Sequence, residues 1–403
     1  MIVSRRRAEY GLLAGTPAPQ WIAACLSAML LAISGAAWAQ AAPERWGLTQ
    51  EARISGHASG IAGLGYTLGL ARASDGTLLV PQPAESVMRI FESAGRFLKL
   101  VGHPGDGPGE FRHIGRYGWT GDTLWVIDDA RRRVSYFGPH GSFIGSESDT
   151  ISSYGLHQTT LVAFLKGGRF LTATQPAIRS VEPLPDSAVG RLYVRDRSGT
   201  QARAILRTPL RGDVARVEYR GGPTLLAQPL ADVPLVAVPP DGGQIVIVER
   251  PTPLSAAGEF TVRRITSDGR PLSSRRYTFD ATRVQQGVLD SIVRTYAKVL
   301  ANTRSAAEAE IAAAVRRAFL HPQWFPAFDK AVVGDDGTVW LRSLAAPTRW
   351  VVLDRDNTKV AEVRLPATAI LGLVQRERIW VIERDADDIQ SIVRYRLDRS
   401  SHP

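Results

Sequence analysis

Short segments of alternating apolar and polar residues, separated by glycine-containing turns, run through most of the chain. The clearest unit spans Gly102 to Phe143, in which a Gly-rich loop precedes the apolar run Leu124 to Ile127 and the alternating segment Val134 to Phe137. Because successive side chains of a strand face opposite sides of a sheet, the pattern predicts an antiparallel meander of four strands. One such sheet cannot bury both of its faces alone, whereas radially stacked copies can.

The turn of this unit recurs along the chain. Turns of the Asp-Gly or Gly-Gly type lie at residues 75, 121, 167, 242 and 336, and the first three are 46 residues apart. The recurrence predicts an all-β fold, a six-bladed β-propeller. The strand Glu51 to Ser55 near the start has no partner next to it, and the last blade, which ends with Ser391 to Leu397, lacks a fourth strand. Pairing them would close the ring and remove exposed sheet edges.

Two insertions interrupt the repeat. From Asp280 to Leu320 the apolar positions follow a helical period, which predicts two helices between blades four and five. These helices either pack onto a propeller face or form a lid over the central channel. The segment from Thr208 to Pro229 is rich in Arg and Gly, and we expect it to be an extended loop.

A family resemblance rests on the same unit. Gly107-Pro108-Gly109-Glu110-Phe111, followed by a strand, a Gly-Asp turn, Leu124 to Asp128 and Arg133 to Phe137, resembles an NHL-type repeat. The chain is similar to NHL-like six-bladed β-propeller proteins that bacteria secrete, most of which have no assigned function. The resemblance implies this fold and brings no catalytic residues with it.

The amino terminus has the pattern of an export signal. Arg5-Arg6-Arg7 precedes the apolar run Trp21 to Ile33 and the cleavage pattern Ala37-Trp38-Ala39. This predicts a signal peptide at residues 1–39, a propeller domain at 40–403, and a periplasmic or secreted protein. The apolar run is short for a membrane span, so we expect none in the mature protein.

Cys25 allows an alternative. Ile22-Ala23-Ala24-Cys25 fits a lipobox, and the protein would then be lipid-anchored through Cys25. If Cys25 is instead removed with the signal, the mature protein has no cysteine, which excludes a thiol nucleophile and a cysteine-ligated zinc site.

The basic charge does not point to a nucleic-acid partner. The formal net charge is +10, with 44 Arg and 5 Lys, and the arginines are scattered along strands and turns. Scattered arginines indicate solvated faces. Export would also remove nucleic acid as the usual partner, and we expect a monomer.

Polar side chains at equivalent positions define the first candidate site. Residues just past each second strand are expected to rim one mouth of the propeller channel. They are Gln82, Asp128, Asp129, Gln175, Glu249, Arg250, Arg342, Glu383 and Arg384. Carboxylates alternate with arginines, which suits either mutual salt bridges around a wet channel or a polar ligand. Asp128 could also be structural, because in the NHL-type repeats that the chain resembles this Asp ends the second strand and can brace Arg133 across the turn.

The Gly-rich loop supplies a second candidate site. His103, Asp106, Glu110 and His113 are residues of metal-ligand type, although their spacing matches no known metal motif and a polar surface loop would look the same.

Two functions remain open. The first is a non-catalytic binding or scaffold module for an envelope protein, peptide or carbohydrate, with no cofactor. The alternative is a metal-dependent hydrolase or lyase of the lactonase-like propeller kind. Asp128, Glu249 and Glu383 would then hold a divalent cation such as calcium, which would activate water. The sequence contains neither HExxH nor GxSxG.

Overall fold

The computed structural model describes most of the chain after residue 43. The described residues are 44–55, 64–67, 69–152, 157–176, 187–198, 202–210, 213–220, 222–250, 257–303 and 306–399. The predicted signal peptide and Cys25 lie outside them. Within this part no helix is long and apolar enough to cross a membrane.

Four antiparallel sheets of four strands each are formed in chain order. The first contains β2 (Ala71–Arg72), β3 (Leu78–Gln82), β4 (Val87–Phe91) and β5 (Phe97–Val101). The second contains β6 (Ile114–Thr120), β7 (Thr123–Asp128), β8 (Arg133–Phe137) and β9 (Phe143–Ser148). The third contains β10 (His157–Leu165), β11 (Arg169–Pro176), β12 (Val189–Arg195) and β13 (Ala202–Pro209). The fourth contains β16 (Leu235–Ala237), β17 (Gln244–Glu249), β18 (Ala257–Thr266) and β19 (Pro271–Asp280).

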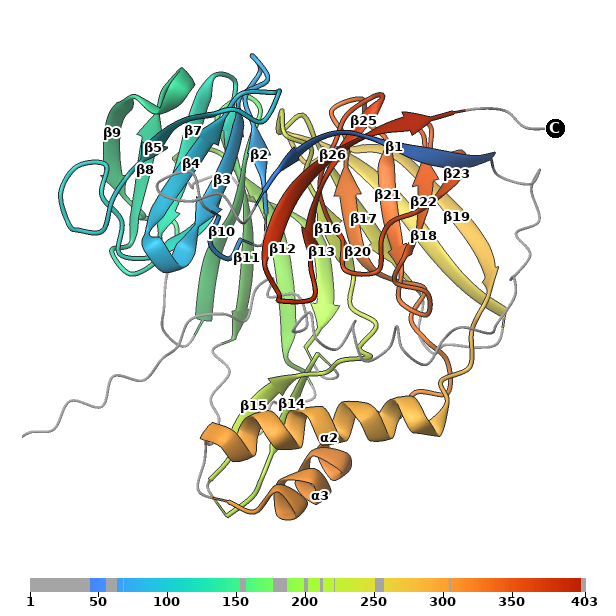
Figure 1. The fold of residues 1–403 in the computed structure, drawn as a ribbon. Coiled ribbons are helices and arrows are strands. Elements are labelled where there is room, and N and C mark those ends of the chain that lie inside the picture. Colours follow the sequence, from blue (N-terminus) through green and yellow to red (C-terminus); the bar gives the residue numbers. More distant parts are fainter. Residues whose placement is uncertain are drawn as a thin grey trace, which may run out of the picture.

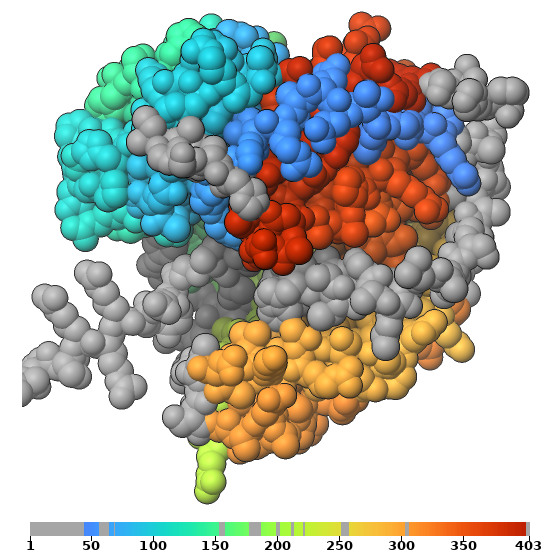
Figure 2. Space-filling view, viewed as in Figure 1, coloured from blue at the N-terminus to red at the C-terminus, as the bar shows by residue number. Residues whose placement is uncertain are grey.

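An eight-stranded sheet contains the remaining long strands together with the first one. Its members are β20 (Phe328–Val333), β21 (Val339–Ser343), β22 (Arg349–Leu353), β23 (Lys359–Arg364), β24 (Ile370–Val374), β25 (Arg378–Arg384), β26 (Gln390–Asp398) and β1 (Glu44–Ile54). β1 pairs antiparallel with β26 from Gly47 to Ile54, and parallel with β23 over Glu44 to Trp46. Figure 1 shows β1 beside β26, and Figure 2 shows it lying across the carboxyl-terminal strands at the surface. The predicted pairing of the first and last strands is confirmed, and β1 is longer than expected.

The cores lie between neighbouring sheets, and consecutive residues of one strand contribute to different cores. Leu79 packs with Leu124 and Phe137 of the second sheet, whereas Leu78 packs with Trp380 of β25. This is what a period of two produces when both faces of a sheet are covered. The result is an all-β, propeller-like fold.

The recurring turns also form as predicted, since they require positive φ and Gly76 and Gly337 adopt +94° and +80°.

A separate cap, which we call the helical cap, consists of two helices and a hairpin. The helices are α2 (Gln286–Thr303) and α3 (Glu308–Ala318), and the hairpin is β14 (Val214–Val217) with β15 (Thr224–Ala227). Figure 1 shows the four elements on one side of the sheets. Their buried residues form one apolar cluster that includes Ile292 of α2 and Val315 of α3.

The hairpin corrects the expectation of an extended loop from Thr208 to Pro229. Val217 is fully buried against the helices, and the Gln228 side chain accepts a hydrogen bond from the Leu320 N–H at 3.0 Å. Leu344, just after β21, belongs to the same apolar cluster. The helical cap therefore packs at the end of the sheets where β21 finishes.

Candidate functional site

The Gly-rich loop between β5 and β6 is anchored by one aromatic side chain. Phe111 is fully buried in the core between the first two sheets, and its N–H donates to the His103 carbonyl at 2.9 Å. Gly102 has φ +75°, and a Cβ there would lie 2.4 Å from the Phe111 ring. Only glycine fits this turn, so the ring can seal the core directly beneath the loop.

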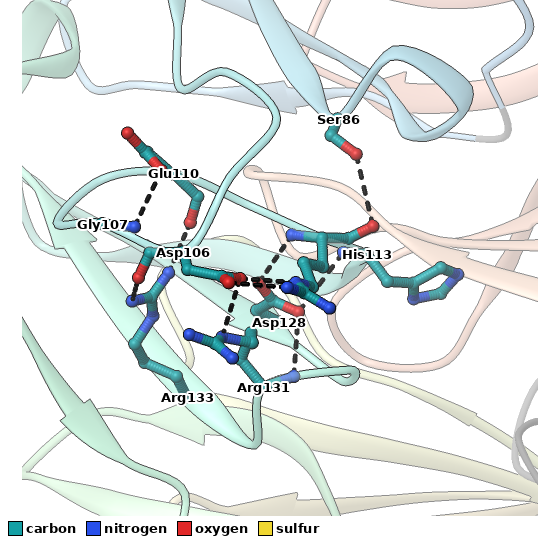
Figure 3. Close-up of polar contacts among 9 residues, drawn as sticks. Ser86, Asp106, Gly107, Glu110, His113, Asp128, Arg131 and Arg133 are labelled. Carbon is teal, nitrogen blue, oxygen red and sulfur yellow. Dashed lines mark hydrogen bonds and ion pairs between the residues drawn. The ribbon is translucent and has the colours of Figure 1, made fainter.

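Asp128, the last residue of β7, holds the end of this loop. Its carboxylate is fully buried and accepts three backbone hydrogen bonds. The donors are the N–H groups of Arg112 at 2.9 Å, His113 at 3.3 Å and Arg131 at 3.1 Å. The expected brace to Arg133 is replaced by these backbone contacts. Figure 3 shows Asp128 at the centre of the group.

Three arginines surround Asp106. Arg112 donates to its carboxylate through Nε at 2.5 Å and Nη2 at 2.6 Å, and Arg131 Nε lies 3.2 Å away. The Arg112 guanidinium holds the pKa of Asp106 below its usual range. Arg133 donates to the carbonyls of Asp106 at 3.0 Å and Glu110 at 2.5 Å. Arg131 and Arg133 therefore tie the loop to β8 and to the turn before it (Figure 3).

Glu110 completes the internal bonding of the loop. Its carboxylate accepts the Gly107 N–H at 2.7 Å, and the His103 Nδ1 lies 3.5 Å from it. Of the four loop residues predicted as a site, Asp106 and Glu110 are thus engaged by donors of the loop and its neighbours. The imidazoles of His103 and His113 face solvent, with 65% and 49% of their side chains exposed.

His113 and Asp129 form the exposed polar pair of this region. Asp129 Oδ2 lies 3.7 Å from His113 Nδ1, and Asp129 raises the pKa of His113. Asp129 also lies against Gly115 of β6, where a Cβ would come within 2.3 Å of its carboxylate. The pair is therefore held in place by the backbone of β6.

The raised pKa of His113 predicts a pH dependence. In Asp129→Asn we expect this pKa to fall towards the ordinary value near 6.5. A raised pKa in the folded state adds stability that is fully present below the unfolded-state pKa and is lost as pH rises through the folded-state pKa. Asp129→Asn should therefore cost more stability at pH 5.5 than at pH 8.5, by less than about 1 kcal/mol because the pair is exposed. NMR titration of His113 and urea unfolding at both pH values test this, and an unchanged His113 pKa in the variant would contradict it.

The channel-mouth candidates lie at or next to the carboxyl ends of the second strands. Gln82, Asp128 and Glu249 end their strands, Gln175 and Arg342 are one residue from the end, Glu383 and Arg384 end β25, and Asp129 and Arg250 follow β7 and β17. Gln82 is buried and Gln175 is half-buried. These residues therefore lie at equivalent strand ends, as predicted. Ligand binding by these residues stays a prediction.

The charged members of this set pair with partners of their own sheet. Glu249 binds Arg263 at 2.6 Å, Arg342 binds Asp329 at 2.6 Å, Arg250 binds Asp232 at 2.5 Å, Arg384 binds Asp388 at 2.8 Å, and Glu383 binds Arg53 at 2.5 Å. In the described part of the chain, none of the nine forms an ion pair with another of the nine on a different sheet. The charges are therefore neutralised locally, each pair contributing roughly 0 to 1 kcal/mol where it is exposed.

The metal-dependent alternative requires carboxylates that converge. Among the described residues, no three or more His, Cys, Asp or Glu side chains are placed to hold one metal ion. Asp128 is occupied by backbone donors, Glu249 by Arg263, and Glu383 by Arg53 and the Tyr395 hydroxyl at 2.6 Å. These three carboxylates do not form the shared site that this alternative requires.

This geometry predicts the response to metals. Calcium, magnesium, zinc and EDTA should leave the melting temperature of the mature chain unchanged at constant ionic strength. A site filled at 100 times its Kd would instead add about 2.7 kcal/mol of stability. Differential scanning fluorimetry is the measurement. A saturable rise with calcium that EDTA reverses and Glu110→Gln abolishes would contradict the prediction and restore the loop as a metal site.

Some polar residues of the two regions were not singled out from the sequence. Arg112 and Arg131 neutralise Asp106, and their spacing of six and 25 residues from it carries no distinctive signal. Lys330 of β20 donates to the Leu371 carbonyl at 3.1 Å, and burial lowers its pKa to about 8. In the sequence, only the position of Lys330 within an otherwise largely apolar strand could have indicated its burial.

Comparisons with known proteins place this geometry in context. No protein-family model and no curated protein matches the chain. Among solved structures, the chain is similar to a candidate exported protein from Bacteroides fragilis, with 12% identity, 87% of this chain and 94% of that chain covered, and a TM-score of 0.44. It is similar to a member of the DUF4221 family from Bacteroides vulgatus, with 10% identity, coverage of 88% and 99%, and a TM-score of 0.44. A streptogramin B lyase is 11% identical, with coverage of 87% and 97% and a TM-score of 0.39. These likenesses accompany the all-β, propeller-like architecture and show no family for the chain.

Proposed function

We propose that the protein is an exported six-bladed β-propeller that acts as a non-catalytic binding module for an envelope protein, peptide or carbohydrate. The eight-stranded sheet then counts as two blades. β1 is the fourth strand beside β24, β25 and β26, and it reaches β23 only through three residues. The apolar clusters outside the helical cap support this count, because each lies between two neighbouring blades and one joins the first blade to the last. In this proposal the mature chain is a periplasmic or secreted monomer, and the helical cap is an insertion between blades four and five.

The observation that carries the proposal is the rigidity of the loop from Gly102 to His113. Arginines donate to the Asp106 carboxylate and to the carbonyls of Asp106 and Glu110. The N–H groups of Arg112 and His113 donate to the Asp128 carboxylate. The side chains of His103, His113 and Asp129 remain exposed. A surface that is ordered before binding loses little conformational entropy when a partner docks. Exposed polar groups on loops held by a rigid scaffold are typical of recognition sites.

A matched pair of variants tests this surface. The mature chain from Gln40 onward and His113→Ala/Asp129→Ala are compared in capture from a periplasmic extract and on peptide and glycan arrays. His140→Ala/Asp75→Ala is the control, because it removes a second His–Asp pair, in which His140 Nδ1 lies 3.6 Å from Asp75 Oδ2. This pair lies at the opposite end of the strands. We expect partners bound by the wild type to be lost with the first variant and kept with the control.

Two results would contradict the proposal. One is the absence of any partner enriched by the wild type over a denatured sample. The other is equal loss of binding in both double variants, since this would show that the region around His113 has no special role.

A further inference from the structure

Pairs of arginines directly opposite each other on adjacent strands occur three times in the described sheets. They are Arg191 and Arg207 on β12 and β13, Arg349 and Arg364 on β22 and β23, and Arg378 and Arg396 on β25 and β26. Residues directly opposite in an antiparallel pair project from the same face with close Cβ atoms. Like charges placed in this way destabilise the sheet, so each pair needs a compensating negative charge.

Two of the three pairs have such a charge within the protein. Arg349 binds Glu362 at 2.6 Å in a two-pronged contact. Arg378 binds Glu51 at 2.7 Å, and Arg396 lies 3.2 Å from Asp398. In these two places the chain itself supplies the compensating carboxylate.

Among the residues that the structure describes, the third pair has no such partner. Arg191 and Arg207 are both exposed, and neither forms an ion pair or a hydrogen bond with any described residue. The register of the third sheet places them in one row with Thr174 of β11 and Thr159 of β10. The two threonine hydroxyls lie 3.0 Å apart, so one of them donates and the other keeps its O–H for a further acceptor.

We infer that Arg191 and Arg207 bind a phosphate or sulfate group on this face of the third sheet. A tetrahedral oxyanion offers acceptor oxygens to two guanidinium forks at once, and up to two negative charges cancel both arginines. The threonine pair supplies one neutral O–H donor on the β11 side of the anion. The site lies on β12 and β13, away from the loop of the proposed function, and it does not depend on that function.

The test compares anions on the full mature chain at constant ionic strength. Sodium phosphate, sulfate, acetate and chloride are titrated in thermal-shift and calorimetric measurements on the wild type and on Arg191→Ala/Arg207→Ala. The matched control is Arg276→Ala/Arg364→Ala, which removes two exposed arginines from other sheets and gives the same net charge. Because sulfate stabilises proteins generally by exclusion from their surface, saturation and dependence on these arginines decide the outcome.

We expect a saturable rise of the melting temperature with phosphate or sulfate in the wild type and the control, and its loss in Arg191→Ala/Arg207→Ala. In chloride alone, Arg207→Ala should melt no lower than the wild type because a repulsion is removed. Arg191→Lys/Arg207→Lys keeps the charge without the forked donors and should bind more weakly. The inference is overturned if the rise is absent, is equal in the Arg191→Ala/Arg207→Ala variant, or is matched by acetate. Comparing the phosphate and sulfate arms shows which of the two groups is preferred.

Discussion

Replacing Asp128 by alanine is expected to lower the free energy of unfolding by about 3–5 kcal/mol. The carboxylate is fully buried and is the acceptor for the N–H groups of Arg112, His113 and Arg131. Alanine leaves the N–H groups of Arg112 and His113 without this acceptor, and each unpaired buried group costs roughly 1–3 kcal/mol. The Arg131 N–H keeps the carbonyl of residue 128, at 3.2 Å, as its partner. The loop from Gly102 to His113 would lose its attachment to β7 as well.

Urea unfolding followed by circular dichroism measures this effect. Asp129→Ala is the control, because it removes a carboxylate at the next position that is 39% exposed and accepts no backbone hydrogen bond among the described contacts. We expect the control to cost less than about 1 kcal/mol. Similar losses in the two variants would show that the three backbone bonds do not stabilise the fold.

Arg264→Ala is the second variant for which we expect a large effect, a decrease of about 3–5 kcal/mol in the free energy of unfolding. Arg264 is 2% exposed and reaches from β18 to the turn after β22. Its guanidinium donates to Asn357 Oδ1 at 2.7 Å and to the carbonyls of Asp354 at 2.6 Å and Gly337 at 3.0 Å. Burial lowers the pKa of Arg264, so the charge is held in place by these acceptors. Alanine would leave Asn357 Oδ1 and the Gly337 carbonyl without this donor and open a cavity between two sheets. The Asp354 carbonyl would keep the Asn357 N–H, at 3.1 Å, as its donor.

Two further variants separate geometry from charge. Arg264→Lys keeps the charge but cannot serve three acceptors with one planar fork, and it should lose more than half of the alanine effect. Arg276→Ala removes an arginine of β19 whose side chain is 72% exposed, and it should cost less than about 1 kcal/mol. If Arg264→Lys unfolded at the wild-type urea concentration, the fork geometry would have no role.

The strands and their closure could be predicted because they depend on local pattern. A period of two marks each buried strand, and positive-φ glycines mark the turns between them. The pairing of β1 with β26 followed from counting, since the first strand had no partner next to it and the last blade lacked a fourth strand. The two helices were located by their change of period between Asp280 and Leu320, the range that contains α2 and α3.

The hairpin β14–β15 could not be predicted for a physical reason. Its strands are only four residues long, and they pack in one apolar cluster with α2 and α3, which follow about 70 residues later. A short segment that folds against a distant element carries little local signal. Its arginines and glycines resembled those of a loop.

The hydrogen-bond partners of the buried polar side chains could not be predicted from the sequence either. Arg264 and Asn357 are 93 residues apart, and Asp128 binds the N–H of Arg112 16 residues earlier. Such pairs depend on the register and packing of sheets rather than on sequence spacing. The positions at the strand ends could therefore be named from the sequence, whereas the partner of each charge could not.

The double pairing of β1 has a consequence for biosynthesis. β1 leaves the ribosome first, yet Arg53 meets its partner Glu383 only 330 residues later. Until the final strand has emerged, β1 can pair only with β23, over Glu44 to Trp46, and the rest of β1 is an open edge, which favours slow folding and aggregation. A chain truncated before β26 would leave β25 and most of β1 without their partner strand. The complete sheet can therefore form only after synthesis of the whole chain.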